Sequence, residues 1–351
     1  MILDEFLSDW YSDSLTLLVH TSGSTGAPKP LLVEKLRMEA SARLTCDFLG
    51  LKRGDTALLC MPLDFIAGKM MVVRALTCGL RLFCVEPTGH PLRTSNSCVY
   101  QLQTAVPSGL SCVAKASPLD MQEVPLHLSF AAMVPLQVYN SLQMPQERER
   151  LARIRHLIIG GGAIDDALTA ELAAFPNQIW STYGMTETLS HVALRRVNGP
   201  DASPWYTPLQ GVKVSQTDDG CLVIDAPMVC HRRLVTRDVA DVRADGRFRI
   251  LGRKDNVVCT GGLKIQMEEV ERLLQPHLNV PFCISYRPDA KYGQAMVLLA
   301  EGGNEDELMQ LCRRHLPTYW QPRHVLIVPR IPLTPTGKVA RAEAKLLAAQ
   351  G

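Results

Sequence analysis

The 351-residue sequence lacks the features that would place a protein in a membrane, outside the cell or on a nucleic acid. Its most apolar stretch, Met70 to Val85, is interrupted by Arg74 and Arg81 and is too short to span a bilayer. There is no run of basic residues and the net charge is only +2, so no nucleic-acid surface is indicated. The residues after Met1 are acidic at positions where a signal peptide would carry positive charge. We therefore expect a cytoplasmic protein with no membrane insertion and no nucleic-acid partner.

Paired zinc-site cysteines, repeats and low-complexity tracts are also absent. The eleven cysteines extend from Cys46 to Cys312 without the C-x-x-C spacing of a zinc site, and this dispersed, odd-numbered usage is typical of reduced thiols. Hydrophobic residues make up 46% and charged residues 21% of the chain, an ordinary globular balance that argues against disorder. The length is sufficient for two or more domains.

Short apolar segments alternate with helical patterns over the first 200 residues. Helices are expected over residues 35–49, ended by Gly50, and over 66–76, 146–153 and 165–175. Buried strands are expected over 56–61, 80–85 and 156–159, with a weaker strand over 110–114. This alternation predicts an α/β architecture with a parallel sheet.

The pattern changes from about residue 205. Asp-Gly turns at 219–220 and 245–246 separate short strands, which predicts a small antiparallel β-rich segment. Beyond Arg253, strands and helices make a compact α+β unit. The predicted fold class is a large N-terminal α/β domain with an appended β-rich segment, followed by a small α+β C-terminal domain. The later strands are expected over 212–215, 222–224, 247–251, 281–286 and 295–299, and the later helices over 268–274 and 305–315.

The most informative segment follows the apolar run of residues 15–19 and reads Thr21-Ser22-Gly23-Ser24-Thr25-Gly26-Ala27-Pro28-Lys29. Its glycines allow a tight turn whose N–H groups approach an anion, its hydroxyls donate further hydrogen bonds, and its lysine adds a mobile positive charge. The segment therefore predicts a polyphosphate-binding loop. It is not a Walker A loop, because the spacing G-x-x-x-x-G-K-[ST] is absent. Taken alone, a flexible Ser/Gly surface loop explains the composition equally well.

Four further motifs follow this loop in order: Tyr183-Gly184-Met185-Thr186-Glu187-Thr188, Thr236-Arg237-Asp238, Gly252-Arg253-Lys254-Asp255-Asn256 and Pro335-Thr336-Gly337-Lys338. Together the five resemble the ordered signature of the adenylate-forming, AMP-binding superfamily, which includes acyl- and aryl-CoA ligases, luciferases and peptide-synthetase adenylation domains. The resemblance runs from about Thr21 to Arg341. It implies an AMP-forming acid–thiol ligase that requires ATP and Mg²⁺, forms an acyl-adenylate and uses coenzyme A as co-substrate.

The resemblance also implies a domain boundary. Residues 1–252 would form the N-terminal domain that binds ATP and the acid, with the β-rich segment at about 205–252. Residues 253–351 would form a mobile C-terminal domain that carries a catalytic lysine and turns about a hinge at Asp255.

Nucleotide-binding roles come from the resemblance as well. Thr186 would donate to the α-phosphate and Glu187 would be a hard oxygen ligand for Mg²⁺, although alone this motif would be read as a strand-end turn with a solvated glutamate. Asp238 would accept from both ribose hydroxyls, and Arg253 would contact the ribose or a phosphate. The turn after strand 156–159 would border the adenine, although it would equally suit a plain strand-to-helix connection. The triphosphate would be held by Thr21, Ser22, Ser24, Thr25, Gly26 and Lys29, and the adenine by Gly161, Gly162, Ala163, Tyr183 and Gly184.

Lys338 would bridge the attacking carboxylate and the α-phosphate, although most loop lysines are solvated and inert. Gly261 and Gly262 resemble the turn that lines the pantetheine tunnel of coenzyme A after the small domain rotates about Asp255. The neighbouring Cys259 is not expected to be a nucleophile, because coenzyme A brings its own thiol.

Arg74 and Lys69 are the candidate substrate-binding cations, because they lie in the segment 62–74 where the family places its acyl-pocket helix. A cation there could pair with a second carboxylate, as the succinyl arm of o-succinylbenzoate would require, and arginine suits this role through its bidentate geometry. The alternative is an arginine that snorkels from the helix edge. Family members usually have a histidine where Phe65 stands.

Within the superfamily, Thr236-Arg237-Asp238 and the segments 134–137, 252–256 and 319–323 resemble the o-succinylbenzoate–CoA ligases of menaquinone biosynthesis. Most other superfamily members have glycine at the position of Arg237. Two alternatives stay open: another acyl- or aryl-CoA ligase or stand-alone adenylation domain, and a catalytically silent nucleotide-binding protein. Only twenty residues precede the loop at 21–29, as in a compact form of the ligase. A homodimer stays open as the assembly.

Overall fold

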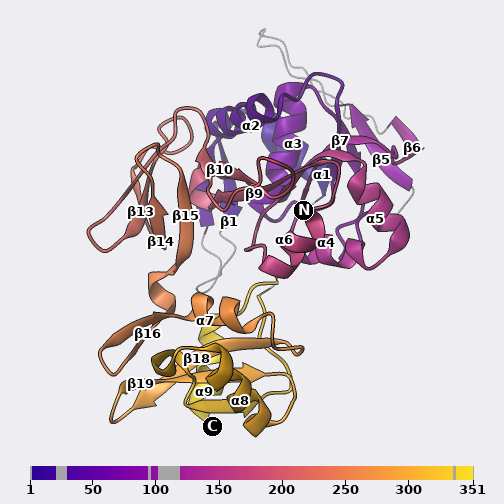
Figure 1. Ribbon diagram of the computed structural model, residues 1–351. Coiled ribbons are helices and arrows are strands. Elements are labelled where there is room, and N and C mark those ends of the chain that lie inside the picture. Colours follow the sequence, from indigo (N-terminus) through magenta and orange to yellow (C-terminus); the bar gives the residue numbers. More distant parts are fainter. Residues whose placement is uncertain (1, 21–29, 94–95, 102–118, 335–336, 351) are drawn as a thin grey trace.

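The computed structural model describes residues 2–20, 30–93, 96–101, 119–334 and 337–350. These residues form a larger N-terminal lobe and a smaller C-terminal lobe (Figure 1). The loop at 21–29 and the weak strand expected over residues 110–114 lie outside the described residues. None of the helices formed by the described residues is long and apolar enough to cross a membrane.

The larger lobe is built on a nine-stranded sheet with the order β11-β10-β9-β8-β7-β3-β4-β5-β6. The five central strands, β9, β8, β7, β3 and β4, are parallel, whereas the strands at both edges pair antiparallel. The parallel sheet predicted from the sequence is therefore confirmed at its centre. The strands are β3 (Thr56–Leu59), β4 (Arg81–Cys84), β5 (Asn96–Gln101), β6 (Leu119–Glu123), β7 (Leu128–Met133), β8 (Ile154–Ile159), β9 (Gln178–Gly184), β10 (His191–Arg196) and β11 (Thr207–Pro208).

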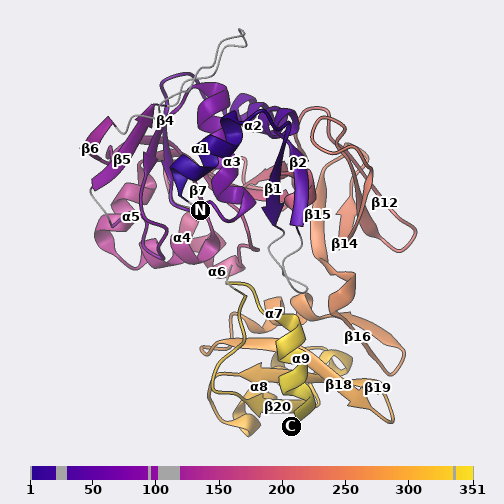
Figure 2. The ribbon, with the colours of Figure 1, turned by 180° about the vertical axis from the view of Figure 1, so that it is seen from behind.

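Helices cover both faces of this sheet (Figures 1 and 2). Successive residues of β3 point to opposite faces, so that Leu59 packs into one core with Met71, and Leu58 packs into a second core with Val138. The first face carries α1 (Leu3–Tyr11), α2 (Lys35–Leu49) and α3 (Ile66–Cys78), and the second carries α4 (Pro135–Leu142), α5 (Pro145–Ala152) and α6 (Asp166–Leu172). The expected end of α2 at Gly50 is confirmed, because Gly50 caps the helix with a left-handed φ of +63°.

Two smaller sheets complete the larger lobe. Strands β1 (Thr16–His20) and β2 (Pro30–Glu34) form an antiparallel pair in which His20 lies opposite Pro30, at the point where the loop of residues 21–29 begins and ends. The expected β-rich segment is a four-stranded antiparallel sheet of β12 (Lys213–Gln216), β13 (Cys221–Asp225), β14 (Leu234–Val242) and β15 (Phe248–Arg253). Its Leu222 and Phe248 belong to the core shared with α2 and α3, so the segment is packed on the larger lobe.

The C-terminal lobe has its own sheet, with the order β17-β16-β19-β18 and with β20 parallel to β19. The chain enters this lobe through a short helix that directly follows β15 (Figure 2). This helix is η2 (Lys254–Asn256), and Asp255 is its middle residue. The elements are β16 (Val257–Thr260), β17 (Leu263–Gln266), α7 (Met267–Leu274), β18 (Phe282–Asp289), β19 (Gly293–Ala300), α8 (Glu305–His315), η3 (Thr318–Trp320), β20 (His324–Ile327) and α9 (Arg341–Gln350). The domain boundary and the hinge at Asp255 stay predictions.

Candidate active site

A cavity of about 420 Å³ lies where the carboxyl ends of β3, β7, β8 and β9 meet, next to the start of α3. This is the edge at which open α/β sheets bind their ligands. Much of the wall is apolar, with Phe65, Ile66 and Val134 among the lining side chains. Of the residues given a catalytic, nucleotide-binding or substrate-binding role from the sequence, those that line the cavity are Arg74, Gly161, Gly184, Thr186 and Lys338.

Two of the cavity glycines are required, one by a close approach and the other by its backbone conformation. A Cβ at Gly184 would lie 2.2 Å from the backbone oxygen of Ser190 and 2.5 Å from the Cα of His191. Gly161 has a φ of +80° in the turn after β8, a conformation that side chains rarely adopt. Gly162 and Ala163 follow in this turn but are not among the residues that line the cavity.

The Thr186-Glu187-Thr188 segment forms a short helix, η1 (Thr186–Thr188), at the cavity rim. Thr186 is buried and lines the cavity, whereas Glu187 is exposed and is not among the lining residues. No group of three or more potential metal ligands occurs among the described residues. One exposed carboxylate fits a Mg²⁺ ion whose other ligands are phosphates and waters.

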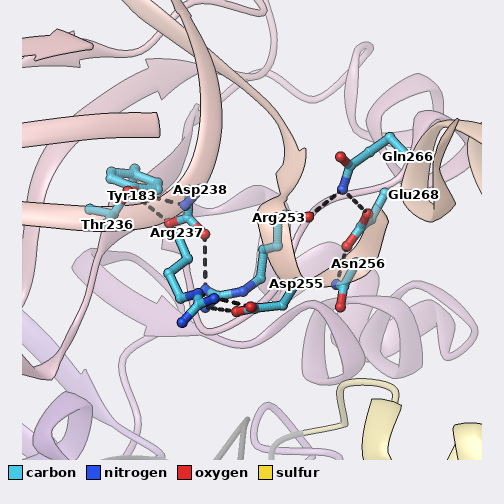
Figure 3. Close-up of polar contacts among 9 residues, drawn as sticks. All are labelled: Tyr183, Thr236, Arg237, Asp238, Arg253, Asp255, Asn256, Gln266 and Glu268. Atoms are coloured by element: carbon cyan, nitrogen blue, oxygen red, sulfur yellow. Dashed lines mark hydrogen bonds and ion pairs between the residues drawn. The ribbon is translucent and has the colours of Figure 1, made fainter. Parts of the chain in front are cut away.

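A second group of polar side chains lies between the β-rich segment and η2 (Figure 3). The Tyr183 hydroxyl donates to Asp238 Oδ2 over 2.6 Å, and Arg253 Nη1 donates to Asp238 Oδ1 over 2.9 Å. Burial and the charge of Asp238 raise the pKa of Tyr183 well above its usual value, so the phenol keeps its proton and remains a donor. Asp238 is thus held by two donors and keeps unused lone pairs for a ligand.

The hinge candidate Asp255 is paired in this arrangement. Arg237 Nε lies 2.8 Å from Asp255 Oδ1, and Arg253 Nη2 lies 3.6 Å from Asp255 Oδ2 (Figure 3). Gln266 of the C-terminal lobe donates to the backbone carbonyl of Arg253 over 2.8 Å. The ion pairs and this hydrogen bond connect the β-rich segment with the smaller lobe.

Lys338 reaches the cavity from the C-terminal lobe. Its loop is closed by hydrogen bonds from Lys338 N to Thr334 Oγ1 (3.1 Å) and from Thr334 N to the Lys338 carbonyl (2.7 Å). The side chain keeps solvent access, but desolvation is the main cause that lowers the pKa of its ammonium below the usual value. Asp238 opposes this lowering and Arg253 adds to it, so the amine is within electrostatic range of the Asp238–Arg253 pair.

Arg74 is buried in the cavity wall, with 2% of its surface exposed. Its Nη2 donates to Ser190 Oγ over 2.6 Å and its Nη1 contacts Met71 Sδ at 3.8 Å, whereas Nε has no partner among the described residues. No carboxylate of the described residues lies within ion-pair distance of the guanidinium. Burial lowers the pKa of Arg74 to about 10. The alternative of an arginine snorkelling to solvent is therefore wrong.

Lys69 is not brought to the cavity with Arg74. Its ammonium donates to the Leu63 carbonyl over 2.5 Å and lies 5.8 Å from the centre of the Phe6 ring, within the core. Five residues along an α-helix correspond to a rotation of about 140°, so Lys69 and Arg74 face different directions on α3. The interpretation of Lys69 as a substrate cation is not supported.

Gly261 and Gly262 form the turn between β16 and β17 and are not among the cavity-lining residues. Their φ values of +57° and +83° show why glycine is required at both positions. The predicted triphosphate ligands Thr21, Ser22, Ser24, Thr25, Gly26 and Lys29 lie outside the described residues. Several polar residues of the cavity wall were not predicted from the sequence, including His20, Ser190 and His191. Ser190 and His191 lie two and three residues after the Tyr183–Thr188 motif, and this closeness to the motif was the available signal.

Comparison with known families agrees with this geometry. The sequence model of the AMP-binding enzyme family matches residues 7–226, and that of the AMP-binding enzyme C-terminal domain matches residues 269–338. The protein belongs to the AMP-binding enzyme family, and the superfamily predicted from its motifs is confirmed.

Two relatives of the chain share one name. The chain is 23% identical to a 2-succinylbenzoate–CoA ligase of Listeria monocytogenes over 97% of this chain and 72% of the relative. It is 25% identical to the enzyme of the same name from Enterococcus faecalis, over 94% of this chain and 69% of the relative.

Solved structures share the fold. An acyl-CoA synthetase (AMP-forming)/AMP-acid ligase II-like protein from Dyadobacter fermentans is 30% identical, with a TM-score of 0.60 over 98% of this chain and 92% of that chain. The o-succinylbenzoate coenzyme A synthetase (MenE) of Bacillus subtilis, in complex with ATP and magnesium ion, is 20% identical, with a TM-score of 0.69 over 93% of this chain and 69% of that chain. The predicted fold class is confirmed.

Proposed function

We propose that the protein is an ATP-dependent, AMP-forming acid–CoA ligase whose acid is 2-succinylbenzoate. It would convert 2-succinylbenzoate, ATP and coenzyme A into 2-succinylbenzoyl-CoA, AMP and diphosphate. The names of the relatives support an acid–CoA ligase and suggest 2-succinylbenzoate as the acid. The observation that carries the choice of a dicarboxylic acid is the buried guanidinium of Arg74, which has no carboxylate partner among the described residues.

A buried charge without a counter-ion is strongly unfavourable, because the charge loses its hydration and the low-dielectric interior offers no interaction that compensates for the loss. Arg74 meets this description: it has no carboxylate partner among the described residues, and its Nε has no hydrogen-bond partner there. An anionic group of the substrate would supply the missing charge through the planar, two-pronged geometry that suits arginine to carboxylates. The apolar wall formed by Phe65, Ile66 and Val134 suits an aromatic ring next to that carboxylate.

The first half-reaction would be adenylation. An oxygen of the reacting carboxylate attacks the α-phosphorus of ATP, the bond to the bridging oxygen of the β-phosphate breaks, and diphosphate leaves. Lys338, at the cavity, would stabilise the charge shared by the carboxylate and the α-phosphate. Thr186 would donate to the same phosphate, and Asp238 would hold the ribose. Mg²⁺, held by Glu187 and the phosphates, would neutralise further charge when bound.

The second half-reaction would be thioester formation. The thiol of coenzyme A attacks the acyl carbon, the bond from that carbon to the bridging oxygen breaks, and AMP leaves with this oxygen. Lys338 lines the cavity whereas Gly261 and Gly262 do not, an arrangement that would serve adenylation. Rotation about Asp255 would bring the glycine turn to the cavity for the second step. The substrates would all be small molecules; a homodimer and a cytoplasmic location stay predictions.

The test is diphosphate release with three related acids, each with and without coenzyme A. These are 2-succinylbenzoate, 4-oxo-4-phenylbutanoate, which lacks the ring carboxylate, and 2-butanoylbenzoate, which lacks the chain carboxylate. We expect a burst with 2-succinylbenzoate alone and turnover when coenzyme A is added. Equal or greater activity with a monocarboxylate would refute the role of Arg74. Failure to release diphosphate with any of the three acids would favour a silent nucleotide-binding protein.

A further inference from the structure

Four side chains form a continuous hydrogen-bonded chain from α3, through the start of β10, to α2. Arg74 Nη2 donates to Ser190 Oγ over 2.6 Å, and Ser190 Oγ lies 3.3 Å from His191 Nδ1. His191 Nε2 lies 3.0 Å from Thr45 Oγ1, which donates to the Ser41 carbonyl over 3.2 Å. Arg74, Ser190, His191 and Thr45 are called the arginine relay below.

The available protons give the relay one direction. Thr45 has a single hydroxyl proton, which it donates in the hydrogen bond to the Ser41 carbonyl. The Thr45 oxygen therefore accepts a hydrogen bond from His191 Nε2–H. In the neutral ring, Nδ1 is then an acceptor for the Ser190 hydroxyl, which leaves the Ser190 oxygen to accept from Arg74. The opposite tautomer would leave the Ser190 proton without an acceptor among the described residues.

His191 is suited to this neutral, connecting role. Its side chain is buried, and burial is the main cause that lowers its pKa well below the usual value, with the positive charge of Arg74 as the second cause. The ring therefore stays uncharged at neutral pH and adds no second positive charge beside Arg74. Its contribution to the site is the orientation of the Ser190 hydroxyl.

The backbone that carries Ser190 and His191 is held in an uncommon conformation. Leu189 has a φ of +66°, a left-handed value that is costly for a residue with a branched side chain. Thr188 Oγ1 donates to the Ser190 carbonyl over 2.7 Å, and the β10–β9 pairing shifts register between His191 and Ala193. Such bulges redirect side chains next to active sites. The local structure thus places Ser190 against Arg74 instead of continuing a regular strand.

We propose that Ser190, His191 and Thr45 are positioning residues that orient the Arg74 guanidinium toward the carboxylate that does not react, and that they thereby determine the preference for dicarboxylic acids. This inference rests on the role proposed for Arg74 above. Ser190 and His191 also line the cavity, whereas Thr45 is fully buried and is not among the lining residues. An effect of Thr45 on substrate choice must therefore pass through the relay.

The experiment compares the kcat/KM for 2-succinylbenzoate with that for the better of its two monocarboxylate analogues. Thr45→Val keeps the shape of the side chain but removes the hydroxyl, and Thr45→Ser keeps the hydroxyl. Loss of one buried hydrogen bond predicts that Thr45→Val lowers the specificity ratio by roughly 3- to 10-fold, mainly through the KM for the dicarboxylate. Thr45→Ser should return the ratio to within about twofold of the wild-type value.

Thr77→Val is the matched control. Thr77 lies on α3, one turn after Arg74, and its buried hydroxyl has no partner among the described residues. The substitution therefore removes a buried threonine hydroxyl outside the relay and should leave the ratio unchanged. A general effect of threonine-to-valine changes on packing would appear in both variants.

Ser190→Ala removes the direct contact to Arg74 at a half-buried position and should lower the ratio further than Thr45→Val does. It keeps the inference testable if Thr45→Val fails to fold. A folded Thr45→Val or Ser190→Ala enzyme with the wild-type ratio would overturn the relay alone. A wild-type enzyme with no preference for the dicarboxylate would overturn both proposals.

Discussion

Replacing Arg74 by methionine should affect stability and catalysis in opposite directions. Burial lowers the pKa of Arg74 from its usual 12.5 to about 10, which at about 1.4 kcal/mol per tenfold change amounts to about 3 kcal/mol against the charged form in the folded state. The substitution removes this unfavourable contribution. It also removes the hydrogen bond to Ser190, which as a bond from a charged donor contributes about 1.5–3 kcal/mol. The net change expected for the ligand-free enzyme lies between zero and about 1–2 kcal/mol of stabilisation.

The pH dependence of this difference can be stated in advance. The folded chain binds the guanidinium proton less tightly than the unfolded chain does, so the unfavourable contribution is fully present below the folded pKa of about 10 and is relieved only above it. The stability difference between Arg74→Met and wild type should therefore be constant between about pH 7 and 9. At lower pH the difference also includes His191, whose pKa the charge of Arg74 helps to lower. Denaturant unfolding of the ligand-free proteins measures it.

Catalysis should change in the other direction. Removing one partner of a buried charge pair lowers kcat/KM for the dicarboxylate by an amount equivalent to about 2–5 kcal/mol, or roughly 30- to 4,000-fold. Activity with the monocarboxylates should change far less, so the specificity ratio should collapse. A loss of 3–5 kcal/mol in ligand-free stability, as expected for breaking a compensated pair, together with an unchanged specificity ratio, would refute the reasoning.

Three further changes test other parts of the site. Lys338→Ala should slow adenylation by about 100- to 1,000-fold, and the variant should still convert supplied acyl-adenylate to thioester. Because the ammonium is the active form and its pKa is lowered, the adenylation rate of the wild-type enzyme should fall as the pH rises through that lowered pKa. Lys338→Arg should move this fall to higher pH. Gly184→Ala places a Cβ 2.2 Å from the Ser190 carbonyl oxygen and should cost about 1–3 kcal/mol of stability in thermal unfolding; an unchanged melting temperature would contradict the close approach. Arg237→Ala removes an exposed ion pair with Asp255 that contributes about 0.2–1 kcal/mol. The ratio of the single-turnover rate of thioester formation to that of adenylation should therefore rise by at most about fivefold. Added salt should raise this ratio of the wild-type enzyme in the same way.

Much of the fold could be predicted where local signals agree. Helix α8 matches its expected bounds because Asn304 caps its start, acidic residues occupy the first turn and basic residues the last. Strand β14 was missed, because its polar Thr236, Arg237 and Asp238 interrupt the apolar pattern by which strands are recognised. The antiparallel edges of the large sheet follow from tertiary pairing, which periodicity does not encode.

Some residues of the candidate site could be predicted from the sequence, but its geometry could be predicted only in part. Motif order pointed to Lys338, Asp238 and Thr186. Lys69 and Arg74 were both chosen because they lie in the segment 62–74, where the family places its acyl-pocket helix, but only Arg74 lines the cavity. The relay through Ser190 and His191 depends on a left-handed residue and a register shift that have no sequence signal of their own.

Isotope transfer tests the central claim, carboxyl activation through an acyl-adenylate, most directly. 2-Succinylbenzoate labelled with ¹⁸O in its carboxylates is incubated with ATP, Mg²⁺, coenzyme A and the enzyme, and the AMP is analysed by mass spectrometry. Because the bridging oxygen of the adenylate comes from the acid and leaves with AMP, each AMP formed should carry one ¹⁸O atom. If AMP and the thioester form in equal amounts but the AMP carries no label, the account is contradicted.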